Sequence, residues 1–204
     1  KTFVAATIAY ATLHTRVSNH GKRLQVAYMA PTEILAKQHF ESFIQYFKGT
    51  DIEIGLLTGS GCKKFPSKLG AESTSVSRTQ LLKWLANGTT SIVIGTHALI
   101  QKSVMFENLA LIIIDEQHRF GVRQRKALAR GKSQSESASK IPHLLSMTAT
   151  PIPRTLALTL FGDLDLTIID EVPSERKKII TEIIQANKRE EMYEHIRHEL
   201  QSGR

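Results

Sequence analysis

Two adjacent carboxylates, Asp115 and Glu116, directly follow the apolar run Leu109–Ile114. Such a run predicts a strand buried on both faces, and the carboxyl edge of an open α/β sheet is where ligands bind. One carboxylate can hold Mg²⁺ through water while its neighbour polarises the water that attacks a phosphoanhydride. His118, two residues further on, is suited to sense a γ-phosphate. The alternative is an ordinary strand end at which two acids face solvent.

Lys1-Thr2 is followed at once by an Ala-rich helical pattern. In a phosphate-binding loop of the form GxxxxGK[ST], the Lys reaches the β- and γ-phosphates and the hydroxyl residue binds Mg²⁺. Lys1 and Thr2 fit the last two positions, and the glycine-bearing turn would then precede residue 1. The pair means little alone, but together with Asp115-Glu116 it predicts a phosphate site.

Small and hydroxyl residues also follow other expected strands, just before helices. Pro31-Thr32 and Thr96-His97 are placed in this way, and Thr58-Gly59 ends a further strand. Backbone N–H groups and hydroxyl oxygens at such positions suit sequence-independent contacts to nucleic-acid phosphates. The alternative is ordinary helix capping by Thr32 and Thr96, and the two roles need not exclude each other.

Two further segments each have a functional and a purely structural interpretation. In Ser146–Pro151 a strand runs into a turn with two threonine hydroxyls, Thr148 and Thr150. The segment either ends the strand or links bound nucleotide to bound nucleic acid. Between Arg119 and Lys132 lie six cations and no acid, which suits a phosphate backbone or a solvated helix face. The eight His show no metal-ligand spacing, and no GxSxG motif supports a serine hydrolase.

The elements that would position these residues alternate along the chain. Short apolar runs alternate with longer periodic segments, which predicts an α/β fold with a mainly parallel sheet flanked by helices. Thr58–Ser75 and Gly131–Lys140 are polar and predict surface loops. We expect strands at Leu24–Ala30, Ile52–Leu57, Ser91–Thr96, Leu109–Asp115, His143–Thr148 and Leu166–Asp170, and helices at Phe3–His14, Ile34–Phe47, Val76–Ala86, Val122–Ala129 and Arg154–Leu160.

The pattern restarts after Val172-Pro173-Ser174, with a strand expected at Lys177–Gln185 and a helix at Lys188–Gln201. We therefore expect residues 1–172 to form one lobe and residues 173–204 to be a linker and the beginning of a second. The start at Lys1 indicates a cut inside a longer gene product.

Composition agrees with this organisation. The 204 residues are 41% hydrophobic and 23% charged, which is ordinary for a globular chain and excludes collagen-like and broadly disordered classes. The longest apolar run falls far short of the roughly 20 residues of a membrane span. Lys and Arg exceed Asp and Glu by 27 to 19, a net charge of +8 that favours nucleic acid as a partner. The single Cys62 permits no internal disulfide and favours a reducing compartment.

Taken in order, the motifs resemble a superfamily-2 helicase core. More narrowly, the chain resembles the RecG family of ATP-dependent DNA helicases over essentially its whole length. The transcription–repair coupling translocase has a similar HRFGV and TATPIPRTL and is the alternative, but the DEAH-like DEQH and the stretch GDLDLTIIDEVPSERK favour RecG. The motifs are KT, APTEILA (Ala30–Ala36), TGS (Thr58–Ser60), IGTHALI (Ile94–Ile100), DEQHRFGVRQR (Asp115–Arg125) and MTATPIPRTLALTLFGDLDL (Met147–Leu166).

The resemblance implies a RecA-like P-loop NTPase lobe of a cytoplasmic helicase that remodels branched DNA and stalled replication forks in recombination and repair. ATP and Mg²⁺ would be its cofactors, and branched or forked DNA its partner, with no membrane involved. It implies that Lys1 binds phosphate, Thr2 and Asp115 hold Mg²⁺, Glu116 is the catalytic base, His118 couples hydrolysis to movement, Thr148 and Thr150 link the nucleotide and DNA sites, and Pro31, Thr32, Gly59, Thr96 and His97 touch the DNA backbone.

The chain also departs from the family pattern. It lacks the glycine-bearing start of the phosphate loop and the N-terminal wedge domain, and it holds only the beginning of the second motor lobe, whose arginine finger would assist catalysis. We therefore predict that these 204 residues alone hydrolyse ATP negligibly. A non-catalytic nucleic-acid-binding lobe is the remaining alternative.

Overall fold

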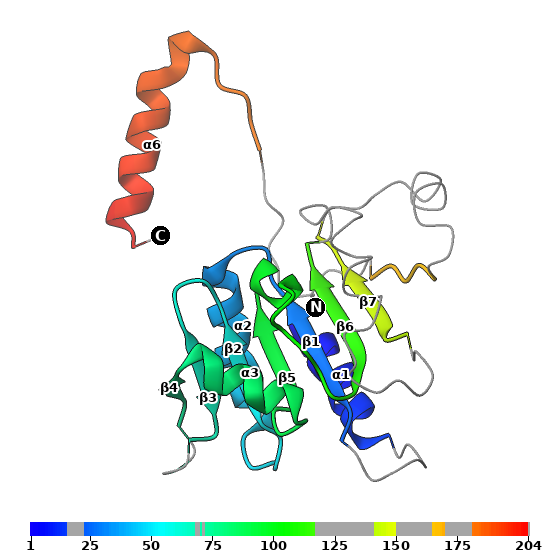
Figure 1. Cartoon of the computed structure of the whole chain (residues 1–204). Helices are drawn as coiled ribbons and strands as arrows, with labels where there is room; N and C mark the ends of the chain where they lie inside the picture. The colour runs from blue at the N-terminus through cyan, green and yellow to red at the C-terminus, as the bar shows by residue number, and fades with distance from the viewer. Residues whose placement is uncertain are drawn as a thin grey trace. The chain divides into compact units, whose positions relative to one another are not determined.

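Seven strands pair into one sheet in the order β4-β3-β2-β5-β1-β6-β7 (Figure 1). The pairs that join β2, β5, β1, β6 and β7 are parallel, while β2–β3 and β3–β4 are antiparallel, so the expected mainly parallel sheet is confirmed. The computed structural model describes residues 1–15, 23–67, 70, 72–116, 141–149, 165–169 and 181–203. The strands are β1 (Gln25–Met29), β2 (Ile54–Leu57), β3 (Cys62–Phe65), β4 (Thr74–Val76), β5 (Ile92–Gly95), β6 (Leu109–Asp115) and β7 (His143–Met147).

Helices cover both faces of this sheet (Figure 1). On one face lie α1 (Thr2–His14) and α2 (Glu33–Phe47), and on the other lie α3 (Arg78–Ala86) and the short 3-10 helix η1 (His97–Ile100). Successive side chains of a strand point to opposite faces. In β1, accordingly, Val26 and Tyr28 belong to the core under α1 and α2, whereas Ala27 and Met29 belong to the core under α3.

Burial on both faces explains why the parallel strands could be recognised in the sequence. All residues of β1, β2 and β5 are buried, and the strand residues alternate between two apolar layers rather than between core and solvent. The helices α1 and α2 begin one residue before the expected positions, and α3 begins at Arg78 because Val76 ends β4 and the Ser77 hydroxyl caps the helix by accepting from the Gln80 N–H.

The prediction of a surface loop over Thr58–Ser75 is wrong, because β3 and β4 extend the sheet there. The polar composition of this segment suggested a loop, but its Lys64 lies in the half-buried strand β3. Its ammonium lies 3.0 Å from a Glu53 carboxylate oxygen and 4.4 Å from the centre of the Trp84 ring. A cationic head that lies over an aromatic ring and is also paired with a carboxylate can occupy a strand at low cost.

The chain divides into two compact units, Lys1–Ile152 and Pro153–Arg204. In the second unit, α6 (Arg189–Gln201) confirms the expected helix, preceded by the short 3-10 helix η3 (Ala186–Lys188). No helix within the described ranges is long and apolar enough to cross a membrane.

Two strands expected in the second unit are absent from its described residues. Leu166–Ile169 forms no strand, nor do residues 181–185. A strand needs the backbone of a neighbour to pair with, and no pairing partner for either segment occurs within the described ranges; Ile169 and Ile183 are accordingly exposed. The expected helices Val122–Ala129 and Arg154–Leu160 and the expected loop Gly131–Lys140 lie outside the described residues.

The buried side chain of Gln25 joins three segments at the amino end of β1. Its amide nitrogen donates to the carbonyl oxygens of Leu85 and Thr90, each at 2.9 Å, and its amide oxygen accepts from the N–H groups of Glu107 and Asn108 at 2.9 and 3.0 Å. All four hydrogen bonds that an amide can make are therefore formed within the protein.

Replacing Gln25 by Leu is expected to lower the free energy of unfolding by about 2–4 kcal/mol, because the substitution leaves several backbone groups without partners. Urea unfolding followed by circular dichroism measures this. Gln45→Leu, at an exposed position on α2, is the matched control and should change stability by no more than about 0.5 kcal/mol. Equal effects of the two substitutions would contradict the structural role of Gln25.

Candidate active site

The register of the sheet brings the ends of five parallel strands to one edge. Met29 lies opposite both Gly95 and Ile114, Leu57 lies opposite Gly95, and Asp115 lies opposite Met147. Because the strands are parallel and in step, the residues that follow them emerge together. This edge carries every sequence-predicted site residue that the structure describes.

Asp115, the last residue of β6, is buried and its carboxylate is held from both sides. One oxygen, Oδ2, lies 3.0 Å from Nε2 of His39, and the other, Oδ1, accepts from the Glu116 backbone N–H at 3.1 Å. Burial by itself raises the pKa of Asp115, but the hydrogen bond and charge of His39, the charge of Lys1 and the Glu116 N–H together hold that pKa below its usual value. Asp115 is therefore a buried, ionised carboxylate.

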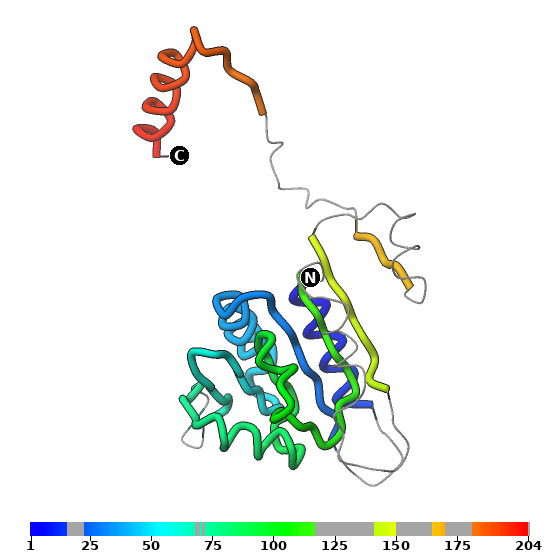
Figure 2. The backbone as a smooth tube through the Cα atoms, turned by 45° about the horizontal axis from the view of Figure 1, so that its top comes forward, coloured from blue at the N-terminus to red at the C-terminus, as the bar shows by residue number. Residues whose placement is uncertain are grey.

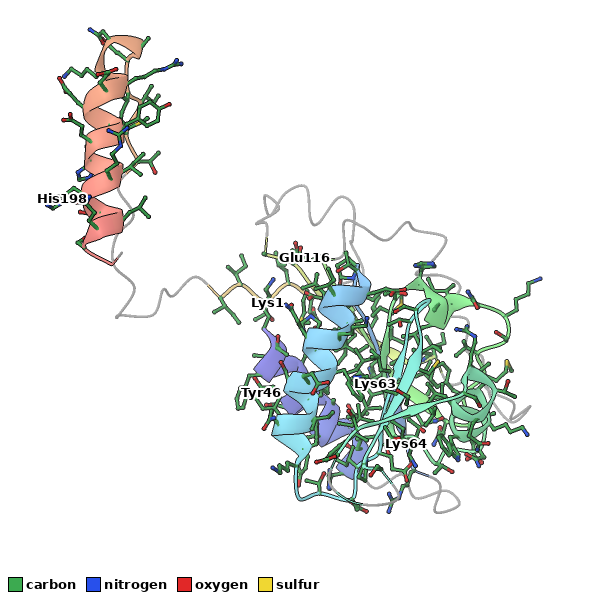
Figure 3. The ribbon with its side chains drawn as sticks, turned by 90° about the vertical axis from the view of Figure 1, so that its left-hand side faces the viewer. Lys1, Tyr46, Lys63, Lys64, Glu116 and His198 are labelled. Atoms are coloured by element: carbon green, nitrogen blue, oxygen red, sulfur yellow. The ribbon has the colours of Figure 1, made fainter. Side chains whose placement is uncertain are left out.

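Glu116 leaves the strand with an unusual backbone. Its φ is +52°, in the left-handed region, and it is the one residue other than glycine with positive φ in the described ranges. Non-glycine residues in this region are uncommon and concentrate at functional sites. The turn directs the Glu116 side chain back toward the first residue of the chain, and Oε1 lies 3.3 Å from the Lys1 ammonium (Figure 3).

Lys1 and Thr2 stand at the start of α1, at the end of the sheet where β6 finishes (Figure 2). Lys1 accepts the first hydrogen bond of the helix, from the Ala5 N–H, through its carbonyl oxygen. The buried residues of α1 are small (Ala5, Ala6 and Ala9), which explains the Ala-rich pattern: small side chains let this helix lie close to the sheet. Lys1 and Glu116, which the sequence analysis assigned to one phosphate site, are thus in contact at this edge of the sheet.

His39 and Tyr28 lie next to Asp115 in the structure, but the sequence analysis did not identify them as site residues. His39 Nε2 also lies 3.4 Å from the Tyr28 hydroxyl, and the two rings are 4.8 Å apart. The signal was present, because His39 follows Ala36 by three residues and precedes Phe43 by four, and so falls on the buried stripe of α2. A polar residue in such a stripe requires a buried partner.

The structure supports helix capping for Thr32 but not for Thr96. The Thr32 hydroxyl caps α2 by accepting from the Leu35 N–H at 3.3 Å, and Thr32 is exposed, so capping leaves it accessible. Thr96 precedes η1, but its hydroxyl makes no capping bond; it is buried without a partner in the described part of the chain. The neighbouring Pro31 is half-buried and His97 is exposed.

Glu33 joins two of the predicted phosphate-contacting segments and was not singled out from the sequence. Its Oε1 accepts from the Ser60 backbone N–H at 3.2 Å. Hydrogen bonds from the Ser60 hydroxyl and from the Ser60 and Gly59 N–H groups lower the pKa of Glu33, although its desolvation acts in the opposite direction. A Cβ at Gly59 would lie 2.8 Å from this oxygen, so glycine is what permits the approach. We call this contact the Glu33–Ser60 clamp.

Glu33→Gln is expected to loosen the turn after β2, because a carboxylate binds N–H groups about twice as strongly as a neutral acceptor does. Amide hydrogen exchange at Gly59 and Ser60 should accelerate severalfold, with Glu41→Gln on the exposed side of α2 as control. Because the pKa of Glu33 is lowered in the folded protein, the stabilisation by the clamp is fully present above the ordinary pKa of 4.5 and is lost as pH falls through the folded value. Unchanged exchange in Glu33→Gln would show that the clamp does not hold the turn.

The remaining predicted site residues are only partly described. Thr148, just after β7, is half-buried at the same edge. His118, Thr150 and the basic residues between Arg119 and Lys132 lie outside the described residues.

The donor set fits a magnesium–nucleotide complex better than a protein-only metal cage. The described ranges contain no group of three or more His, Cys, Asp or Glu side chains that would hold a metal. Mg²⁺ is usually bound by one or two carboxylates, with phosphates and water completing its shell. The ionised Asp115 carboxylate, next to the paired Glu116 carboxylate and Lys1 ammonium, provides that arrangement.

A sequence profile of the DEAD/DEAH box helicase family matches residues 1–159. With this match and a RecA-like sheet flanked by helices, the chain belongs to the DEAD/DEAH box helicase family. Among individual proteins, it is 44% identical over all its 204 residues to ATP-dependent DNA helicase RecG of Bacillus subtilis, covering 26% of that protein. It is 47% identical over 181 residues to RecG of Synechocystis, covering 88% of this chain and 19% of that protein.

Solved structures give the same grouping. A structure of RecG bound to a three-way DNA junction matches with a TM-score of 0.70 and 37% identity, over 99% of this chain and 24% of that one. The Hef helicase domain of Pyrococcus furiosus matches with a TM-score of 0.50 and 25% identity, over 79% of this chain and 31% of that one. The chain thus spans about a fifth to a quarter of the length of the curated relatives it matches.

Proposed function

We propose that this chain is the first motor lobe of an ATP-dependent DNA helicase that couples Mg-ATP hydrolysis to movement on DNA and remodels branched DNA and stalled forks in recombination and repair. The observation that carries the proposal is the meeting of Lys1 with Glu116 beside the buried Asp115. Similarity to RecG proteins along the chain supports the choice of this helicase group over others.

Each charged group of the cluster has one task in this proposal. Lys1 binds a phosphate oxygen of ATP, and Asp115, with the Thr2 hydroxyl, holds Mg²⁺. Glu116 is the catalytic base, which orients the attacking water and accepts its proton. Mg²⁺ held in this way would neutralise the negative charge that develops on the phosphate oxygens during hydrolysis, and Lys1 would add a second positive charge.

The contact to DNA is proposed for the neighbouring part of the same edge. Pro31, Thr32, Gly59, Thr96 and His97 are proposed to approach the DNA backbone. Thr32, Gly59 and His97 are exposed at this edge, whereas Pro31 is half-buried and Thr96 is buried. The Glu33–Ser60 clamp supports this arrangement by holding the turns after β1 and β2 together. Thr148 and Thr150 are proposed to link the two sites, and His118 to couple hydrolysis to movement.

We propose further that residues 1–172 form the motor lobe and residues 173–204 the linker and beginning of a second lobe. Partners of this lobe would be that second lobe and a wedge domain of the same polypeptide, together with branched DNA. A cytoplasmic location suits a DNA substrate and the unpaired, buried Cys62.

The test uses the extended protein, which we define as this chain within a polypeptide of the length of its relatives. It should hydrolyse ATP in a manner stimulated by three-way junction DNA and should unwind the junction, whereas the 204 residues alone should hydrolyse ATP negligibly. Linear duplex DNA of the same length is the control. Nucleic-acid binding without any ATP hydrolysis by the extended protein would instead favour a non-catalytic binding lobe.

A further inference from the structure

His39 connects helix α2 to strand β6 and has no role in the function proposed above. It projects from the second turn of α2 toward the end of β6, where its Nε2 lies 3.0 Å from Asp115 Oδ2. Both side chains are nearly withdrawn from solvent, with 12% of the His39 side chain and 11% of the Asp115 side chain exposed. The contact is thus largely shielded from competition by water.

The chemistry of the pair fixes which atom carries the hydrogen. An ionised carboxylate only accepts hydrogen bonds, so Nε2 of His39 is the donor. The imidazole is held in this orientation by Tyr28, whose fully buried ring is 4.8 Å away and is itself packed edge-on against Phe43 at 5.4 Å. Two aromatic side chains, one from β1 and one from α2, therefore set the direction of the His39 N–H.

Both oxygens of the Asp115 carboxylate are therefore engaged by hydrogen bonds. Oδ2 of Asp115 is bonded to His39 and Oδ1 to the Glu116 N–H at 3.1 Å, so both oxygens are fixed by donors from different elements. Each oxygen keeps a second lone pair for another partner. Orienting partners of metal-bound carboxylates typically change metal affinity by 10–100-fold when they are removed.

We propose that His39 is a positioning residue that fixes the Asp115 carboxylate in the orientation required to bind the metal of a metal–nucleotide complex. The inference rests on the proposed function of the same edge of the sheet, and extends it from the residues that follow the strands to one within α2. His39 itself does not touch nucleotide or metal in this proposal. It acts only through Asp115.

The test compares two substitutions in the extended protein. His39→Leu retains an apolar side chain of moderate size but removes the N–H, whereas His39→Gln retains an N–H donor at a similar reach. The first readout is Mn²⁺ binding to the ADP-bound protein, titrated by electron paramagnetic resonance. We expect about tenfold weaker Mn²⁺ binding for His39→Leu and recovery to within about threefold of the unchanged protein for His39→Gln.

Two further measurements separate positioning from general damage. ADP binding measured in EDTA should be the same for all variants, because the metal is absent there. Gln38→Leu, the preceding and exposed residue of α2, should leave Mn²⁺ binding unchanged. In the 204-residue chain, nitrogen-15 spectra of the imidazole should show hydrogen on Nε2 of His39.

The outcomes distinguish the two proposals. Equal Mn²⁺ binding by His39→Leu and the unchanged protein would overturn the positioning role, as would weak binding by both His39 variants or hydrogen only on Nδ1. Loss of ADP binding in EDTA would show a structural role instead. If the unchanged extended protein neither binds ADP nor hydrolyses ATP, it is the proposed function itself that fails.

Discussion

Glu116→Gln in the extended protein is expected to lower the rate of ATP hydrolysis by about 10²–10⁴-fold, the usual contribution of a positioned general base. The amide has nearly the same size as the carboxylate and can remain beside Lys1, but it cannot accept a proton from the attacking water. Steady-state phosphate release, with and without junction DNA, measures the effect.

Nucleotide binding should survive the same substitution. Lys1 and Asp115, to which the proposal assigns the contacts to phosphate and metal, are unchanged, so the dissociation constant of a fluorescent ATP analogue should stay within about threefold. Glu41→Gln, an exposed acid on α2, is the matched control and should hydrolyse ATP normally. Near-normal turnover by Glu116→Gln would remove Glu116 from the catalytic role, and with it the central assignment of the site.

Gly95→Ala is expected to cost roughly 3 kcal/mol or more of folding free energy, a large loss for the addition of a single methyl group. A Cβ at Gly95 would lie 2.3 Å from the backbone carbonyl oxygen of Leu57 and 3.1 Å from the Leu99 side chain. Because the nearest atom belongs to the backbone of β2, the collision is relieved only by separating two central, paired strands. Thermal and urea unfolding of the 204-residue chain measure the loss.

Gly49→Ala provides the comparison. Gly49 has a φ of +87°, where a side chain strains the backbone, but nothing lies within 4 Å of the position of its Cβ. Its substitution should cost only about 1–2 kcal/mol. If Gly49→Ala proved the more damaging change, close strand approach would not be what requires glycine at Gly95.

The sheet and the edge that carries the site could be predicted because their signals are local. An uninterrupted apolar run such as Leu109–Ile114 predicts a strand covered on both faces, and the residue after it must emerge at the carboxyl edge. Asp115, Thr32 and Thr96 could therefore be assigned to one edge without knowing any contact. The antiparallel β3–β4 extension was missed because Lys64 is accommodated in β3 by contacts to Trp84 and Glu53, which are not its neighbours in sequence.

Contacts between elements account for the rest of what the sequence did not reveal. The His39–Asp115 bond joins residues 76 positions apart, and the Lys1–Glu116 pair joins residues 115 apart. The left-handed backbone of Glu116 likewise has no signature in its residue type, since glutamate rarely adopts it. Residue types could suggest which side chains do chemistry, but only the packing of α2 and α1 on the sheet shows how they are held.

Helix α2 makes two different contacts within its first two turns, and these have a mechanical consequence. The helix begins at Glu33, which is hydrogen-bonded to the turn after β2, and its second turn carries the His39 imidazole, which is hydrogen-bonded to Asp115. An α-helix is stiff along its axis and rises about 1.5 Å per residue. A shift of one such step exceeds what a hydrogen bond of 3.0 Å tolerates. No loop separates the two contacts of α2. A ligand that displaced the first turn of α2 would therefore also displace the His39 imidazole and break its hydrogen bond to the Asp115 carboxylate.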